Sequence, residues 1–265
     1  MKKRVLFIFA VLFFGAFFSV NSAVAGMTEL TFACENKQDF PTIMGDADTV
    51  DAAKPGMGVV AIKMLEKKLG VKIKVIRLPW KRCLLHLEQG KVDGVFTASF
   101  KEKRKVHGRY PEKDGKVDVD RRYSSASYSL YKMKGSKVGF DGEKFLNITG
   151  SVGAPRGYSI VDDLKKKGLT IDAGPSTTKD FSKMLKGRLQ AVAALEMTGD
   201  FYLMSNKDFG SKIEKVTPNI VMKPYYFMLS NQLYAKDKVL CEKIFDTIAE
   251  IRDSADYKMN LKDYL

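Results

Sequence analysis

The side chains that most often carry out metal or nucleophilic chemistry are few in this sequence. It contains three cysteines, Cys34, Cys83 and Cys241, and two histidines, His86 and His107. Neither set has the short, regular spacing of a zinc site, so we expect no metal and no cofactor. An odd number of cysteines allows at most one disulfide within the chain. The spacing leaves open whether Cys34 or Cys83 pairs with Cys241.

Charge is the second property that limits the possible chemistry. The chain has 45 Lys and Arg residues against 31 Asp and Glu, a formal net charge of +14. Such a surface attracts anionic partners and favours an acidic solute, although composition alone cannot select one. The lysines are spread along amphipathic segments and form no single basic tract, so we expect no nucleic-acid partner.

The N-terminus has the pattern of a secretory signal peptide. Lys2, Lys3 and Arg4 precede an uncharged apolar run over residues 5–20, and a small-x-small sequence ends at Ala25. A membrane anchor is the alternative, but a bilayer core needs about 20 apolar residues. No Leu-x-x-Cys lipobox occurs nearby. We therefore expect residues 1–25 to be a signal peptide that is cleaved near Ala25, and the protein to lie in the periplasm.

Behind this leader, strand and helix patterns alternate. Residues 30–33 are a short apolar run that opens into a polar loop, and apolar residues recur at helical spacing over residues 59–69. Further strand, helix and strand patterns follow up to residue 96, and the same alternation restarts at residue 151. The sequence therefore predicts an α/β protein in which mostly parallel sheets are flanked by helices.

Two aromatic strand patterns separate the repeated halves. They occupy residues 126–133 and 223–230, and no Gly/Ser linker lies between the halves. This arrangement predicts two lobes joined by two hinge crossings, at about residues 128–133 and 225–230. We expect one lobe to comprise residues 26–130 plus 227–265, and the other residues 131–226. In open α/β sheets, ligands bind where the strands end, so the residues after each strand are the candidates for a site.

Residues 80–104, WKRCLLHLEQGKVDGVFTASFKEKR, resemble the central signature of one protein family. This family is the type II periplasmic solute-binding proteins, in the branch that binds polar amino acids, also called extracellular solute-binding protein family 3. Its signature has an aromatic residue opening a helix, then Leu-x-x-Gly-Lys-(Val/Ile)-Asp, a strand, a Ser/Thr-rich turn and a Glu-x-Arg. Two further segments, residues 152–159 and 187–196, are similar to the family's second-lobe motifs.

The resemblance implies a set of ligand-binding residues. Arg104 takes the position of the family's carboxylate-binding arginine, and its planar guanidinium suits bidentate pairing with a carboxylate. The other residues that the resemblance implies are Phe40 and Trp80 as aromatic walls, Thr97 and Ser99 as hydroxyl donors, Tyr158 and Ser159 at a helix N-terminus, and Glu196.

The amine end of the site departs from the family. The family's ammonium-binding Asp should fall near Leu195, and the acid present is Glu196, one position later. Two alternatives remain: Glu196 binds the ammonium group, or the solute is not an α-amino acid.

The resemblance predicts a monomer that binds a small carboxylate-bearing solute by lobe closure and delivers it to an ABC-type permease, without catalysis. Two alternatives stay open. One is a periplasmic dehydratase-like enzyme on the same scaffold, for which Glu196 is the candidate acid. The other is a sensor subunit that presents its closed form to a membrane receptor.

Overall fold

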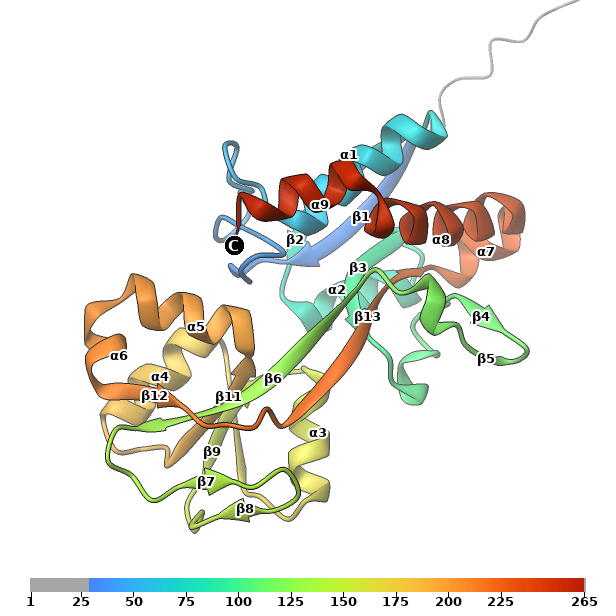
Figure 1. The fold of residues 1–265 in the computed structure, drawn as a ribbon. Coiled ribbons are helices and arrows are strands. Elements are labelled where there is room, and N and C mark those ends of the chain that lie inside the picture. The colour runs from blue at the N-terminus through green and yellow to red at the C-terminus, as the bar shows by residue number, and fades with distance from the viewer. Residues whose placement is uncertain (1–28, 265) are drawn as a thin grey trace, which may run out of the picture.

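The structure is a computed structural model that describes residues 29–264. It consists of two lobes joined by two long strands, β6 (Ser124–Met133) and β13 (Val221–Leu229), which lie side by side and run from one lobe to the other (Figure 1). All the larger strands form one continuous sheet, in the order β10-β9-β11-β6-β13-β3-β1-β2. The predicted signal peptide lies outside the described residues.

The first lobe contains one end of this sheet. Strands β1 (Glu29–Glu35), β2 (Lys72–Leu78) and β3 (Gly94–Ser99) are parallel, and β13 pairs antiparallel with β3. Side chains of α1 and α8 fill one core cluster, and side chains of α2 fill a second. The helices of this lobe are α1 (Met57–Leu69), α2 (Trp80–Glu88), α7 (Asn231–Lys236), α8 (Lys238–Asp253) and α9 (Ala255–Lys262).

The second lobe repeats the arrangement. Strands β9 (Val152–Pro155), β10 (Ile171–Gly174) and β11 (Ala191–Leu195) are parallel, whereas β6 pairs antiparallel with β11. A short strand, β12 (Ile213–Lys215), pairs with the end of β6. The helices of this lobe are α3 (Ser159–Lys166), α4 (Thr177–Leu185), α5 (Glu196–Ser205) and α6 (Lys207–Lys212).

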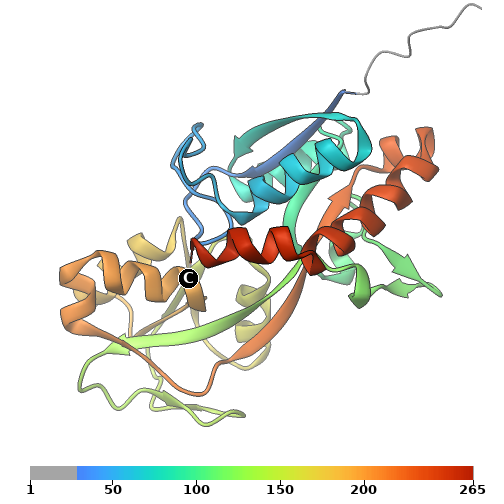
Figure 2. The same ribbon diagram turned by 45° about the horizontal axis from the view of Figure 1, so that its top comes forward.

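Smaller elements decorate both lobes. The charged segment that follows Tyr110 forms a hairpin of β4 (Glu112–Lys113) and β5 (Lys116–Val117), and a similar hairpin joins β7 (Gly139–Phe140) to β8 (Phe145–Leu146). Two 3-10 helices, η1 (Glu102–Arg104) and η2 (Val119–Arg121), complete the set. Helix α9 runs over the first lobe beside α1, and its end lies near the waist of the molecule (Figures 1 and 2).

The positions of the two crossings follow from which core each aromatic residue packs in. Tyr123 packs in the first lobe's core and Tyr128 in the second lobe's core, so the first crossing spans residues 124–127. Tyr225 packs in the second lobe and Phe227 in the first. The second crossing therefore lies at about residues 225–226. The first crossing lies just before the segment expected from the sequence, and the second lies at the start of its expected segment, because each aromatic strand extends well into a core.

Three features of the described residues concern metal binding, disulfide bonds and membrane spans. No cluster of three or more His, Cys, Asp or Glu side chains in residues 29–264 could hold a metal ion. Cys34, Cys83 and Cys241 are buried free thiols, and Cys34 and Cys83 belong to different core clusters of the first lobe. Within the same part of the chain, every helix is too short or too polar to cross a bilayer.

Candidate functional site

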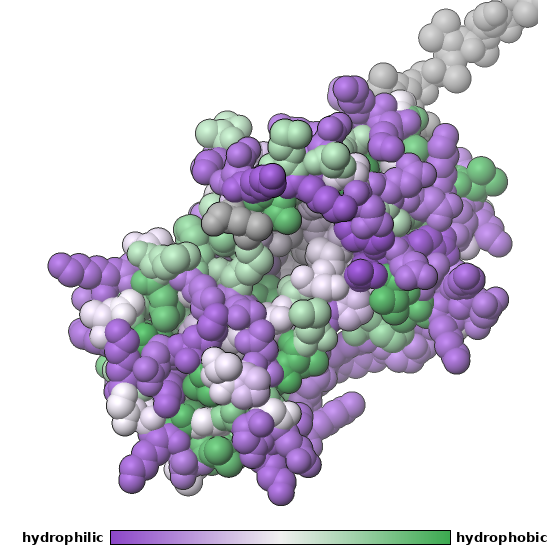
Figure 3. Space-filling model, viewed as in Figure 1, coloured by the Kyte–Doolittle hydropathy of each residue, from purple (hydrophilic) through white to green (hydrophobic). Residues whose placement is uncertain are grey.

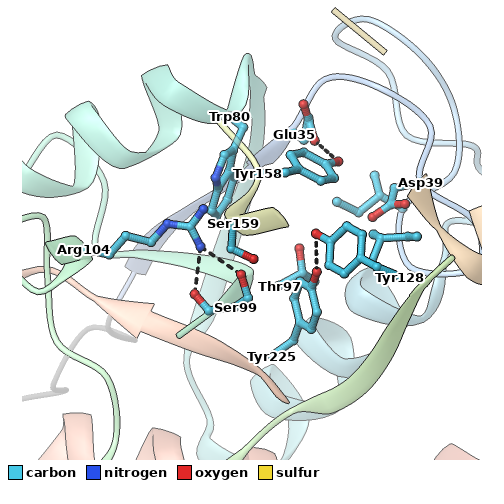
Figure 4. A pocket seen from close by; sticks show the side chains of 12 residues that line it. Glu35, Asp39, Trp80, Thr97, Ser99, Arg104, Tyr128, Tyr158, Ser159 and Tyr225 are labelled. Carbon is cyan, nitrogen blue, oxygen red and sulfur yellow. Dashed lines mark hydrogen bonds between the residues drawn. The ribbon is translucent and has the colours of Figure 1, made fainter. Parts of the chain in front are cut away.

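A pocket lies between the two lobes, where the strands of both half-sheets end. The empty space among its walls is about 350 Å³. Six of the eight side chains expected from the sequence line it: Trp80, Thr97, Ser99, Arg104, Tyr158 and Ser159 (Figure 4). The structure therefore brings together residues that are up to 79 positions apart in the chain, although their role in binding stays a prediction.

Arg104 is the buried cation of this pocket. It follows β3 at the end of η1 and is only 5% exposed. Its Nη1 donates to the carbonyl and hydroxyl oxygens of Ser99, at 2.7 and 3.0 Å, and its Nη2 donates to the carbonyl of Gly157 in the other lobe, at 2.9 Å. The guanidinium also lies 5.6 Å from the ring centre of Trp80. No described carboxylate forms an ion pair with it, so its charge is uncompensated.

The end of β3 is shaped to present side chains to the pocket. Val95 pairs with Met228 and Ala98 pairs with Tyr226. Between these two pairs, β3 therefore contains one residue more than β13. This extra residue is a β-bulge, which bends a strand and redirects its side chains. Thr97 lies in the bulge with φ of 70°, a conformation that is unfavourable for a β-branched residue. Such strain is common where a backbone is held for function.

The second lobe contributes the N-terminus of α3. Gly157 turns the chain with φ of 85°, and Ser159 begins the helix while lining the pocket. Ser159 accepts a hydrogen bond of 3.0 Å from Lys223 of β13, which also pairs with Asp163. Burial lowers the pKa of Lys223. A helix N-terminus with a cation beside it favours anions.

Two carboxylates that sequence reasoning missed also line the pocket. Glu35 ends β1, is 5% exposed, and accepts hydrogen bonds from Lys37 at 3.0 Å and from the Tyr158 hydroxyl of the other lobe. Asp39 lies in the following loop and accepts a hydrogen bond from Thr198 of the second lobe. Burial raises the pKa of Asp39 to about 7. A signal for both existed, since they follow the first strand of a parallel sheet.

Two expected residues, Glu196 and Phe40, lie outside this pocket. The carboxylate of Glu196 accepts hydrogen bonds from Lys215 and Asn219, both at 2.8 Å, and Leu195 takes the position at the pocket wall. Phe40 stacks on Phe201 of the other lobe, with centroids 4.6 Å apart. The structure thus does not bring Glu196 to the pocket, because a lysine and an amide of its own lobe already satisfy it.

Glu196 and Phe40 both line a larger groove at the waist, beside the first crossing. On the face drawn in Figure 3, hydrophilic residues cover most of both lobes, whereas apolar and intermediate residues gather between them. Inside the pocket, the hydroxyls of Tyr128 and Tyr225 are hydrogen-bonded at 2.8 Å, so each crossing strand also supplies a pocket wall.

No protein-family model and no curated protein matches this sequence. Solved structures do match in fold. An ancestral arginine-binding protein bound to arginine has a TM-score of 0.68 at 20% identity, covering 89% of this chain and 98% of that chain. A putative binding component of an ABC transporter from Wolinella succinogenes, complexed with lysine, has a TM-score of 0.69 at 15% identity, with 89% and 95% covered.

A third similar structure is a histidine kinase sensor domain with similarity to periplasmic binding proteins. Its TM-score is 0.71 at 14% identity, and the match covers 90% of this chain and 96% of that chain. At such identities the likeness concerns the fold. The chain therefore has the two-lobed fold of the periplasmic binding proteins, and its structural neighbours include amino-acid-binding proteins, which confirms the fold expected from its sequence.

Proposed function

We propose that this protein binds a small, polar, carboxylate-bearing solute between its lobes in the periplasm and delivers it to an ABC-type transporter. The observation that carries the proposal is Arg104, a buried guanidinium with no carboxylate partner among the described residues. An unpaired buried charge is costly, and an anionic ligand removes that cost. The N–H groups of Arg104 that Ser99 and Gly157 do not use remain for such a ligand.

The opposite wall of the pocket suits a positively charged group. Glu35 and Asp39 both line it, whereas Glu196 lies outside it. Glu35 pairs with Lys37 through one carboxylate oxygen, and its other oxygen accepts from Tyr158. A solute with a carboxylate at one end and an ammonium at the other would therefore place the ammonium near Glu35 and Asp39. The neighbours bound to arginine and lysine support an amino-acid-like solute of this kind.

Closure of the lobes would complete the site. The contacts that cross the cleft come from both sides of the pocket: Tyr158 with Glu35, Thr198 with Asp39, and Arg104 with Gly157. Rotation about the two crossings, residues 124–127 and 225–226, would separate all of these contacts together. A solute that bridges the same groups stabilises the closed form, by its differential affinity for that form.

A periplasmic sensor role is the alternative that a specific observation favours. The histidine kinase sensor domain among the similar structures has the highest TM-score of the three described here. Both roles use the same capture step, so they differ only in the membrane partner that recognises the closed form. Capture of a permease or of a receptor kinase by the solute-loaded protein separates them.

The enzymatic alternative loses its candidate acid, because Glu196 lies outside the pocket. Asp39 is the residue that could replace it, since an acid with a pKa of about 7 can act as a proton donor at neutral pH. Turnover of a cyclohexadienyl acid by the purified protein would support catalysis. Binding of one solute per chain without product supports the transport role.

A thermal-shift screen of amino acids, amines and small carboxylates tests the proposal. A ligand at 100 times its Kd stabilises the folded state by about 2.7 kcal/mol. We expect Arg104→Ala to weaken the active solute at least roughly 30-fold, the usual result of truncating one partner of a buried charge pair. Arg82→Ala, which removes an exposed arginine of α2, is the matched control and should retain the shift. Equal shifts in both variants would remove Arg104 from the site.

A further inference from the structure

A second hollow lies on the outer side of Arg104, between α2 of the first lobe and α3 of the second. Arg104 and Tyr158 line both this hollow and the solute pocket, so they form the wall between the two spaces. The outer hollow has a strongly basic lining. Apart from Arg104, its cations are Lys81, Lys101, Lys103, Arg156 and Lys165.

Most of this positive charge has no local compensation. Asp162 is the one carboxylate among the described lining residues, and Lys101 and Lys103 both pair with it. Lys81, Arg156 and Lys165 are exposed and form no ion pair with any described carboxylate. We refer to these three residues as the cationic rim. Lys101 also lies 3.8 Å from Asp163, which is outside the lining. The positive charges around this hollow therefore outnumber the carboxylates that pair with them.

The rim is assembled from both lobes. Lys81 belongs to α2, whereas Arg156 and Lys165 belong to the turn before α3 and to α3 itself. The lobes approach closely at this point, since a Cβ added at Gly157 would lie 3.1 Å from Cγ of Lys81. Lys101 also reaches Asp162 across the cleft at 2.7 Å. Closure therefore brings like charges together, and an anion between them would offset their repulsion.

We propose that this hollow is a second binding site, separate from the solute pocket, for a polyvalent anion such as a short inorganic polyphosphate or a polycarboxylate. A monovalent anion would balance only part of the charge, and salt screens such exposed charges within about 10 Å. A polyvalent anion reaches the cations of both lobes at once. The site goes beyond the proposed function, because the solute pocket requires Arg104 and this site requires the cationic rim.

Binding of inorganic tripolyphosphate to the full chain, measured by calorimetry at low salt, tests this proposal. The variant Lys81→Gln/Arg156→Gln/Lys165→Gln should bind tripolyphosphate at least about tenfold more weakly than the parent, because it loses the three unpaired charges. The control Lys63→Gln/Lys67→Gln/Lys207→Gln removes the same net charge from exposed positions on α1 and α6. It should bind as the parent does.

Two further variants test whether the site spans both lobes. Lys81→Gln alone and Arg156→Gln/Lys165→Gln should each weaken binding, and a loss that comes entirely from one lobe would overturn the proposal. Equal weakening by the rim and control variants would reduce the effect to net charge and would also overturn it.

A last variant separates the outer hollow from the solute pocket. Glu35→Gln removes a negative charge from the solute pocket and changes no residue that lines the outer hollow, so it should leave tripolyphosphate binding unchanged. If this variant binds tripolyphosphate several-fold more tightly, the anion occupies the solute pocket instead. That outcome would overturn the second site and leave the solute-binding proposal standing.

Discussion

Arg77 and Arg104 are two arginines of the first lobe that are equally buried, at 5% exposure each, yet differ in what surrounds them. Neither forms an ion pair with a described carboxylate. Arg77 donates to backbone carbonyls of its own lobe, those of Glu35 at 3.1 Å, Met44 at 3.4 Å and Thr49, and it lines none of the pockets described above. Arg104 contacts both lobes and faces the pocket.

The difference shows that burial and an unpaired charge do not by themselves identify a ligand-binding arginine. Arg77 donates through Nε and Nη1 to the end of β1 and the loop that follows it, so it fixes the shape of that loop, although its buried Nη2 has no hydrogen-bond partner among the described residues. Arg104 satisfies part of its donors on one residue, Ser99, whose carbonyl also accepts from Tyr110 at 2.9 Å. Removing Arg104 would leave the Ser99 carbonyl bonded to Tyr110. Removing Arg77 would take a donor from three carbonyls, of which that of Met44 keeps a backbone donor, Asp51, and that of Glu35 belongs to a buried residue.

The largest effect that this comparison predicts is on stability. Arg77→Met should lower the free energy of unfolding by about 3 kcal/mol, because each buried polar group left unpaired costs roughly 1–3 kcal/mol. For a chain of this size that corresponds to a fall in Tm of roughly 6–12 °C. Arg104→Met should change the Tm of the unliganded protein by no more than about 3 °C, because it also removes an uncompensated buried charge. The Tm of both variants, measured by thermal unfolding without solute, tests this prediction.

Solute binding provides the reciprocal measurement. Arg77→Met, assayed well below its Tm, should still give a solute-dependent thermal shift, and Arg104→Met should not. An equal fall in Tm in both variants would contradict this prediction, because Arg104 would then stabilise the fold as much as Arg77 does.

The sequence predicted the guanidinium end of the pocket better than the acidic end, for a physical reason. The resemblance to a known family implied Trp80, Thr97, Ser99 and Arg104, and all four lie within or directly after one β-α-β unit whose elements follow from local patterns. Asp39 lies in a loop that Arg77 ties down through hydrogen bonds spanning 28 to 42 positions, and no periodicity reports such contacts. Glu196 was expected in the site from its position in the family's second-lobe motif, and its actual partner, Lys215 of β12, cannot be inferred from spacing.

The fold was predicted well for a related reason. Alternating strand and helix patterns in each half predicted two α/β lobes, and two aromatic strands predicted the crossings. The first crossing begins earlier than expected, because residues such as Tyr128 and Leu130 of β6 belong to the second lobe's core. An aromatic strand pattern predicts that its residues are buried, but it does not predict which of the two cores contains each residue.

The second prediction concerns pH, and it contrasts the acidic end of the pocket with the guanidinium end. Burial in the closed form raises the pKa of Asp39 from 3.8 to about 7. The closed form therefore binds more protons than the open or unfolded form between about pH 4 and pH 7. Its stability is fully present below pH 4 and falls as the pH rises through 7, by up to about 1.4 kcal/mol per pH unit.

Asp39→Asn isolates this contribution. Burial also raises the pKa of Asp180 in the second lobe to about 7, so the parent carries two such groups. The difference in Tm between parent and Asp39→Asn should therefore change between pH 5 and pH 8. Parallel curves for parent and Asp39→Asn would show that Asp39 is ionised when the lobes are closed.

The smallest predicted effect concerns Thr97, which the β-bulge holds at a positive φ beside Arg104. Thr97→Gly should raise the stability of the unliganded protein by about 1 kcal/mol, because glycine adopts this conformation without strain. The same change removes a hydroxyl from the pocket, so solute affinity should fall several-fold, the usual value of one hydrogen bond of about 1 kcal/mol.

Asp114→Gly is the matched control for this prediction, because Asp114 has a similar φ of 51° in the exposed β4–β5 hairpin, away from the pocket. It should gain comparable stability and keep the parent's affinity. Opposite changes in stability and affinity at Thr97, with a change in stability alone at Asp114, would mean that the strain at Thr97 is maintained for ligand binding. If Thr97→Gly keeps full affinity, the bulge instead serves the β3–β13 pairing, and Arg104 acts without it.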